Sequence, residues 1–157
     1  MRLLICAGGT GGGVYPALAV HSALTAKVTD VDTLWVGGKG GMEESLVKRQ
    51  GIAFASVPAA GLHGVGLSAL PGNLLTLGRG VFAARRILKE FKPDVMFFTG
   101  GYVAAPVAIA GASIPILLYT PDIEPGLALK SLARYADVIA VTTSQSQKFF
   151  KKKVRET

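Results

Sequence analysis

Short apolar runs alternate with helix-like segments along the whole 157-residue chain, and this alternation restricts the fold more than any other feature. Strands that are apolar throughout, each followed by a helix, are typical of parallel strands covered on both faces. Right-handed crossovers between them give an open, doubly wound (Rossmann-like) α/β sheet. We expect strands at 3–7, 33–36, 54–57, 95–98, 116–119 and 138–141, and helices at 16–26, 42–50, 73–91, 125–134 and from 144 onward.

The composition is strongly apolar for one domain, with 50% hydrophobic residues and a mean hydropathy of +0.43. No charged residue occurs between positions 95 and 119, which is long enough for a membrane span. Glycines and prolines interrupt this stretch, so we expect a strand, a glycine turn, a short helix and another strand. The single cysteine, Cys6, excludes an internal disulfide and fits a reducing, cytoplasmic compartment.

Positive charge is concentrated in two segments of a chain whose net charge is +7. Residues 79–92 and 148–156 each contain five basic residues and one acidic residue. A solvated helix face explains such a run, and so does an anionic surface or substrate.

The first segment belongs to the long expected helix, which Asn73 can cap. The start of this helix has more apolar residues than one core-facing side of a helix needs. They can dock on an anionic bilayer or pack into the core. The candidate membrane contacts are Leu70, Leu74, Leu75, Arg79, Phe82 and Arg86.

Five glycines and one threonine follow the first expected strand, at positions 8–13. Glycine permits positive φ and lets a ligand approach the main chain closely. In a doubly wound sheet this loop lies beyond the carboxyl ends of the strands, where the N–H groups of the next helix attract a phosphate. Thr99, Gly100 and Gly101 form a second glycine turn after another strand. Two such turns on one edge can hold a diphosphate between them.

Two common nucleotide-binding motifs fit the first glycine loop less well. The dinucleotide fingerprint needs a third glycine where Val14 stands, and an acid where 37–39 reads Gly-Gly-Lys. A P-loop needs Gly-Lys-Ser or Gly-Lys-Thr, whereas residues 38–40 are Gly-Lys-Gly. A tight turn without any ligand is the structural alternative.

Several motifs in order resemble the MurG family, the N-acetylglucosaminyltransferases that make lipid II in peptidoglycan synthesis. The resemblance covers essentially the whole chain. It rests on Gly8-Gly9-Thr10-Gly11-Gly12 with Pro16-Ala17-Leu18-Ala19, Gly61-Leu62-His63-Gly64, Lys92-Pro93-Asp94-Val95, Gly100-Gly101-Tyr102-Val103 with Pro106, and Pro125-Gly126-Leu127 with Lys130.

The resemblance implies the amino-terminal, acceptor-side half of a glycosyltransferase B fold, peripheral on the inner face of the cell membrane. The resemblance also implies that the donor-binding domain is absent from this chain. The implied reaction is inverting: the 4-hydroxyl of a polyprenyl-diphosphate-linked muramyl acceptor attacks the anomeric carbon of UDP-N-acetylglucosamine, and UDP leaves. No metal, no other cofactor and no nucleic acid is implied. The implied substrate-binding residues are Thr10, Gly11, Gly12, Gly13, His63, Gly100, Gly101, Tyr102 and Asp122.

Two departures from the family pattern affect the expected chemistry. Gly13 stands where the family usually has histidine, and Tyr119-Thr120-Pro121-Asp122 replaces His-Glu-Gln-Asn. Asp122 and Glu124 are therefore the candidate catalytic carboxylates, although Asp122 can equally cap the helix expected from Pro125. His63 can touch the acceptor or be solvent-exposed, and His21 lies too far along its helix to be expected in catalysis.

Two other functions remain open from the sequence. The chain can be a membrane-recruiting subunit that binds the acceptor, or half of a transferase with a different acceptor. Residues 151–157 contain no completed element, so we expect a larger protein to continue beyond them.

Overall fold

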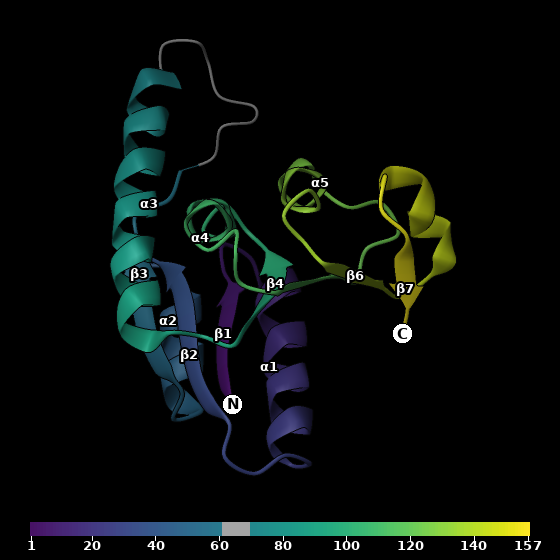
Figure 1. Cartoon of the computed structure of the whole chain (residues 1–157), viewed down its shortest axis with the longest axis horizontal. Coiled ribbons are helices and arrows are strands. Elements are labelled where there is room, and N and C mark those ends of the chain that lie inside the picture. Colours follow the sequence, from purple (N-terminus) through teal and green to yellow (C-terminus); the bar gives the residue numbers. More distant parts are fainter. Residues whose placement is uncertain (61–69) are drawn as a thin grey trace.

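Seven parallel strands form one open sheet in the computed structural model, which describes residues 1–60 and 70–157 (Figure 1). The order is β3-β2-β1-β4-β5-β6-β7, so the chain moves outward from β1, returns, and continues on the other side from β4. This is the doubly wound topology that the sequence predicts. The strands are β1 (Arg2–Ala7), β2 (Asp32–Gly38), β3 (Ala53–Val57), β4 (Val95–Gly100), β5 (Ile116–Thr120), β6 (Val138–Val141) and β7 (Val154–Glu156).

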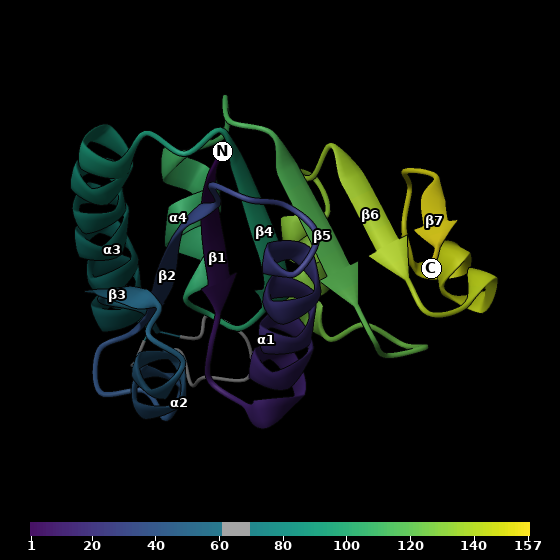
Figure 2. The same ribbon diagram turned by 90° about the horizontal axis from the view of Figure 1, so that it is seen from below.

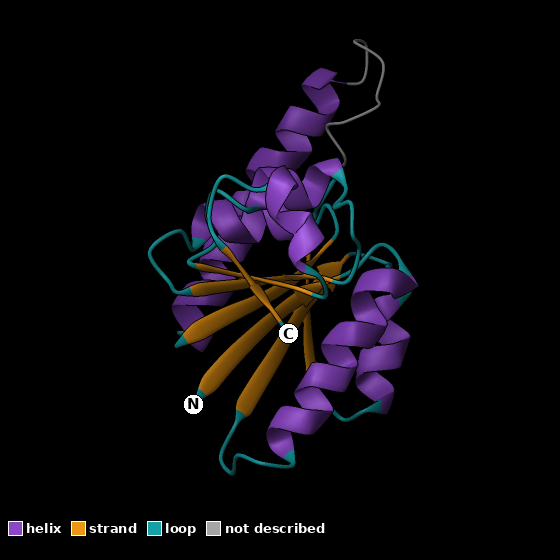
Figure 3. Ribbon diagram, turned by 90° about the vertical axis from the view of Figure 1, so that its right-hand side faces the viewer, coloured by secondary structure: helices purple, strands orange, loops and turns teal. Residues whose placement is uncertain are grey.

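Helices cover both faces of the sheet (Figure 3). On one face lie α1 (Gly11–Thr25) and α2 (Glu43–Arg49), and on the other lie α3 (Leu70–Phe91), α4 (Ala104–Ala110) and α5 (Leu127–Leu132). A short 3₁₀ helix, η2 (Ser144–Phe149), connects β6 to β7. Each face of the sheet therefore has its own apolar core, and the strands are buried on both sides, as their continuous apolar runs require.

Successive side chains of a strand point alternately into the two cores. In β1, Leu4 and Cys6 face α3 and α4, whereas Leu3 and Ile5 face α1 and α2. Trp35 in β2 is fully buried, and its indole N–H donates a 2.9 Å hydrogen bond to the carbonyl of Ala7 at the end of β1. That bond satisfies the polar atom of the ring and fixes the end of β1, where the first glycine loop begins.

The first helix starts earlier than the expected residue 16. It begins at Gly11, so three of the glycines form its first turn and Pro16 lies inside it. Glycine is a poor helix former, but tertiary contacts hold this turn. Val14 is fully buried, and the Thr99 hydroxyl donates a 2.8 Å hydrogen bond to the Gly13 carbonyl.

Three further boundaries differ from the expectation. The long helix begins at Leu70, so Asn73 lies within its first turn and does not cap it. Helix α5 begins at Leu127 after Gly126, with no side-chain cap, so Asp122 does not cap it either. Residues 154–156, for which no completed element was expected, pair with β6 as β7, because Ile139 to Val141 leave an open edge.

The uncharged stretch 95–119 folds as expected into β4, a glycine turn, α4 and β5. Within the described part of the chain, no helix has the length and apolar character needed to cross a membrane.

Candidate anion-binding site

The sheet changes direction between β1 and β4, which is where doubly wound folds bind ligands. At the carboxyl ends of these neighbouring strands lie residues 8–10, the first glycine bend, and residues 99–101, the second glycine bend. The strand ends and the start of α1 meet at this edge in Figure 2. The expectation that both turns open on one edge is confirmed.

The two bends are in direct contact. A Cβ atom added to Gly101 would lie 2.3 Å from the carbonyl oxygen of Gly8, so only glycine fits there. Gly100 and Gly101 also have positive φ, +117° and +90°, which side chains disfavour. The hydrogen bond from Thr99 to Gly13 joins the second bend to the first turn of α1. The bends thus form one continuous backbone surface.

The glycines of the first loop serve two different purposes. A Cβ on Gly8 would lie 2.3 Å from a carboxylate oxygen of Glu43, so Gly8 is required by internal packing. By contrast, a Cβ on Gly9 would meet nothing within 4 Å, and one on Gly12 would meet only the Thr10 hydroxyl, at 3.8 Å. Gly9, with φ +87°, and Gly12 therefore border open space, where a ligand can approach the main chain.

The first turn of α1 offers the amides for such a ligand. The N–H groups of Gly13 and Val14 share the Thr10 carbonyl, at 3.3 and 3.4 Å. Among the described residues, the N–H groups of Gly11 and Gly12 have no acceptor, as is usual in a first helical turn. No acidic residue occupies this turn. The partial positive charge of the helix start is therefore available to an anion.

Sequence reasoning missed Glu43, the most buried charged residue of this region, which is 1% exposed. It lies at the start of α2, and its carboxylate accepts hydrogen bonds from the N–H of Gly38 at 2.7 Å and of Gly9 at 3.4 Å. Glycines at 8, 37 and 41 leave room for it. The only available signal was an acid shortly after three glycines in 37–40, which resembles an ordinary helix start.

The loop between β5 and α5 places the two candidate carboxylates at the same sheet edge. Asp122 is exposed, and its side chain has no hydrogen bond or ion pair within the described residues. Glu124 is also exposed and pairs with Lys130 at 3.4 Å. Tyr119 packs against the core under α1, and Thr120 is fully buried with an unpartnered hydroxyl. Of these four side chains, Asp122 alone is both exposed and unpaired in the described structure.

Of the remaining candidate residues, Tyr102 lies next to the glycine bends and His63 lies outside the described residues. Tyr102 follows the second bend and is half-exposed. His21 contacts the Thr33 hydroxyl at 3.1 Å, and burial lowers the pKa of its imidazole. Burial, and next the Glu43 charge, raise the pKa of the Cys6 thiol, which is fully enclosed.

Helix α3 presents a separate surface. Leu75, Arg79, Phe82 and Arg86 recur at spacings of four, three and four residues, so they lie along one side of the helix. All four are exposed, and Ala84 and Leu88 on the opposite side of the helix are buried. Together with the exposed Leu74, these four residues make up the α3 stripe. Leu70, a further expected membrane contact, is the first residue of α3.

The parallel topology and the glycine bends define a doubly wound domain of the kind found in glycosyltransferases. The chain belongs to the glycosyltransferase family 28 N-terminal domain family, which matches residues 3–141. A crystal structure of Acinetobacter baumannii MurG superposes with a TM-score of 0.81 at 28% identity over 99% of this chain and 44% of that one. The UDP-GlcNAc 2-epimerase of Methanocaldococcus jannaschii shares the fold, with a TM-score of 0.68 at 13% identity over 95% of this chain and 41% of its own.

The chain is also similar in sequence to curated proteins. The UDP-N-acetylglucosamine--N-acetylmuramyl-(pentapeptide) pyrophosphoryl-undecaprenol N-acetylglucosamine transferase of Desulforudis audaxviator is 41% identical over 99% of this chain and 42% of its own length. The protein of the same name from Roseiflexus is 39% identical over 95% of this chain and 39% of its own. The chain thus spans about two fifths of the length of these relatives.

Proposed function

We propose that this chain is the acceptor-side half of an inverting N-acetylglucosaminyltransferase that acts on a polyprenyl-diphosphate-linked muramyl acceptor, as lipid II synthesis requires. The meeting of the two glycine bends at one sheet edge is the main support, because the adjoining amides of Gly11 and Gly12 have no acceptor among the described residues. The relatives' names supply the donor, UDP-N-acetylglucosamine, and the acceptor class. We assign the donor-binding half to the remainder of the relatives' length, which this chain does not span.

The proposed chemistry needs a base for the acceptor hydroxyl and stabilisation of the leaving diphosphate. Asp122 is the better candidate base, because Glu124 is already paired with Lys130. Gly13 adds no side chain to the site, and a Cβ there would meet Thr99 at 3.3 Å. No metal is assigned. Among the described residues, no three histidine, cysteine or acidic side chains gather as metal ligands would.

The α3 stripe supports a peripheral position on the cytoplasmic face of the membrane. Exposed Leu75 and Phe82 offer apolar area, and Arg79 and Arg86 beside them offer charge for anionic headgroups. A surface that combines both binds bilayers without spanning them. The membrane would thus hold the chain beside its lipid-borne acceptor.

Replacing Gly12 tests the anion site directly. Gly12→Asp puts a carboxylate beside the free amides, where it competes with the diphosphate. We expect binding of farnesyl diphosphate, measured by calorimetry, to weaken about tenfold or more, because one charge-assisted contact is lost. Gly12→Asn has the same shape without the charge and should bind more tightly than the aspartate variant. Equal affinities of the two variants, or equal binding of farnesol and farnesyl diphosphate, would contradict the proposal.

A fusion protein separates the alternative functions. Residues 1–157 are joined to the carboxy-terminal remainder of the Desulforudis audaxviator relative, and transfer of radiolabelled N-acetylglucosamine is measured with muramyl and non-muramyl lipid acceptors. We expect transfer to the muramyl lipid and none by residues 1–157 alone. Transfer only to another lipid would indicate a different acceptor. Acceptor binding without any transfer would favour a recruiting subunit.

A further inference from the structure

The peptide between Gly8 and Gly9 lies where the first bend, the second bend and α2 meet. Its N–H points to the Glu43 carboxylate, at 3.4 Å. Its carbonyl points toward Gly101, because a Cβ on Gly101 would lie 2.3 Å from that oxygen. In a trans peptide the N–H and the C=O point in opposite directions, so both contacts fix the same plane. The orientation of one peptide thus determines how the two bends meet.

The buried Glu43 carboxylate is held in place as an acceptor of backbone hydrogen bonds. It is enclosed, and its firm anchor is the 2.7 Å hydrogen bond from Gly38. A buried carboxylate needs such partners, since desolvation is costly without them. The hydrogen bond from Gly9 is longer, at 3.4 Å, so the Glu43 side chain links the first glycine bend to the end of β2.

We propose that Glu43 is a positioning residue for the anion site: it locks the Gly8–Gly9 peptide so that the Gly8 carbonyl stays against the second bend. This inference rests on the proposed function of the site. With glycine on both sides, the peptide would otherwise rotate easily. A flipped peptide would turn the Gly8 carbonyl toward the Glu43 carboxylate and away from Gly101, so the contact that aligns the two bends would be lost. The Glu43 carboxylate therefore favours anion binding through geometry, although its own charge opposes it.

Two substitutions separate geometry from charge in the 157-residue chain. Glu43→Gln removes the charge and nearly preserves the shape, and Glu43→Asp keeps the charge but shortens the reach. If Glu43 acts by position, both variants should bind farnesyl diphosphate about tenfold more weakly, because the hydrogen bonds of a charged acceptor are lost or stretched. If it acts by charge alone, Glu43→Gln should bind more tightly and Glu43→Asp should be unchanged, which would overturn the proposal.

Amide hydrogen exchange gives a readout that does not depend on the ligand. In both variants we expect exchange at Gly9 to rise about tenfold, with the amides of β4 and β5 unaffected. Equal acceleration throughout the sheet would show general destabilisation, and protection at Gly9 that survives would overturn the proposal. If no variant and no wild type binds farnesyl diphosphate, the proposed function fails, while the exchange data still test the peptide lock.

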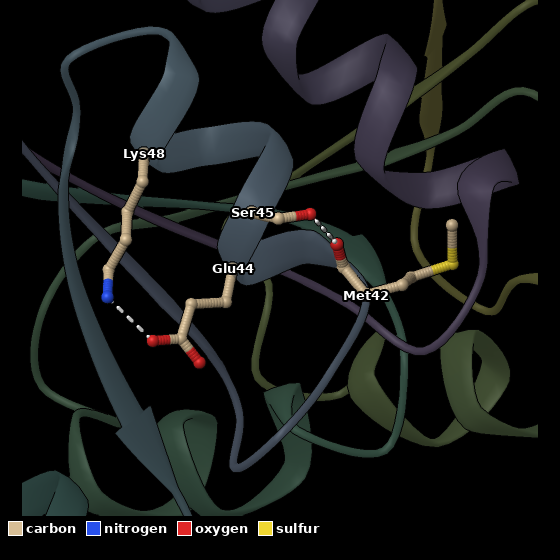
Figure 4. Close-up of polar contacts among 4 residues, drawn as sticks. All are labelled: Met42, Glu44, Ser45 and Lys48. Atoms are coloured by element: carbon tan, nitrogen blue, oxygen red, sulfur yellow. Dashed lines mark hydrogen bonds and ion pairs between the residues drawn. The ribbon is translucent and has the colours of Figure 1, made fainter.

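The neighbouring Glu44 offers a matched control. It lies in the same turn of α2, but its side chain is partly exposed and its carboxylate pairs with Lys48 at 2.7 Å (Figure 4). Nearby, the Ser45 hydroxyl donates a hydrogen bond to the Met42 carbonyl, so this side of the turn is satisfied without the glycine bends. Glu44→Gln removes the same charge one residue away. It should change neither exchange at Gly9 nor diphosphate affinity, and a loss of affinity equal to that of Glu43→Gln would overturn the proposal.

Discussion

Gly101→Ala is expected to lower the free energy of unfolding by about 3–5 kcal/mol, a large share of what a domain of this size has. Two costs combine. A left-handed φ of +90° strains any side chain, typically by about 1–3 kcal/mol. The new methyl group would also lie 2.3 Å from the Gly8 carbonyl oxygen. Because that oxygen is backbone, no rotamer change relieves the clash, and such overpacking costs about 1–3 kcal/mol more.

Urea unfolding followed by circular dichroism measures this loss as a lower midpoint with an unchanged slope. Gly78→Ala is the matched control, because Gly78 lies in α3 and a Cβ there would meet nothing within 4 Å. That variant should gain about 0.5–1 kcal/mol, since alanine is the better helix former. A Gly101→Ala protein within about 1 kcal/mol of the wild type, a small loss for a buried clash, would show that the two bends are not in tight contact.

The fold was predictable because its signals are local. Each buried parallel strand is a continuous apolar run, and each run is followed by a helical period, so the doubly wound sheet follows from β1 to β6 without tertiary information. The short β7 was not predictable, because its three residues, Val-Arg-Glu, have no strand pattern of their own. It forms only because β6 offers an edge.

The candidate site was predictable in part. The glycine pattern located the bends but could not show which glycines face a ligand and which make room for a side chain. Gly8 faces Glu43, which lies much later in the chain and is brought there by β2. The start of α1 at Gly11 likewise depends on Thr99 in β4. Both features arise from contacts between distant segments, which no local pattern encodes.

The second large effect is expected at the α3 stripe, whose apolar side chains should bind a membrane surface. Leu74, Leu75 and Phe82 are 57%, 58% and 68% exposed, which is unusual for three large apolar side chains on one helix. The first turns of α3 extend beyond the end of the sheet in Figures 1 and 3, so a flat surface can approach them. Burying each such side chain contributes roughly 1–2 kcal/mol, scaled from the value for full burial.

Replacing all three of these side chains with glutamine is therefore expected to weaken partitioning to phosphatidylcholine–phosphatidylglycerol vesicles by at least about a hundredfold. Vesicle co-sedimentation measures this change. Thermal unfolding should be nearly unchanged, because the substituted positions are exposed and glutamine suits a helix. Val20→Gln, an exposed apolar position on α1 at the other face of the sheet, is the control and should partition like the wild type.

The arginines of the stripe should act differently from its apolar residues, and this difference tests the mechanism of docking. Replacing Arg79 and Arg86 with glutamine should weaken partitioning by about thirtyfold, at roughly 1 kcal/mol for each charge near an anionic surface. The loss should shrink in high salt, which screens these charges, and on vesicles of phosphatidylcholine alone. Arg49→Gln on α2 removes one exposed positive charge from the other face and should have no effect. If all exposed arginines contributed equally, binding would reflect the net charge of +7 and no oriented contact through α3.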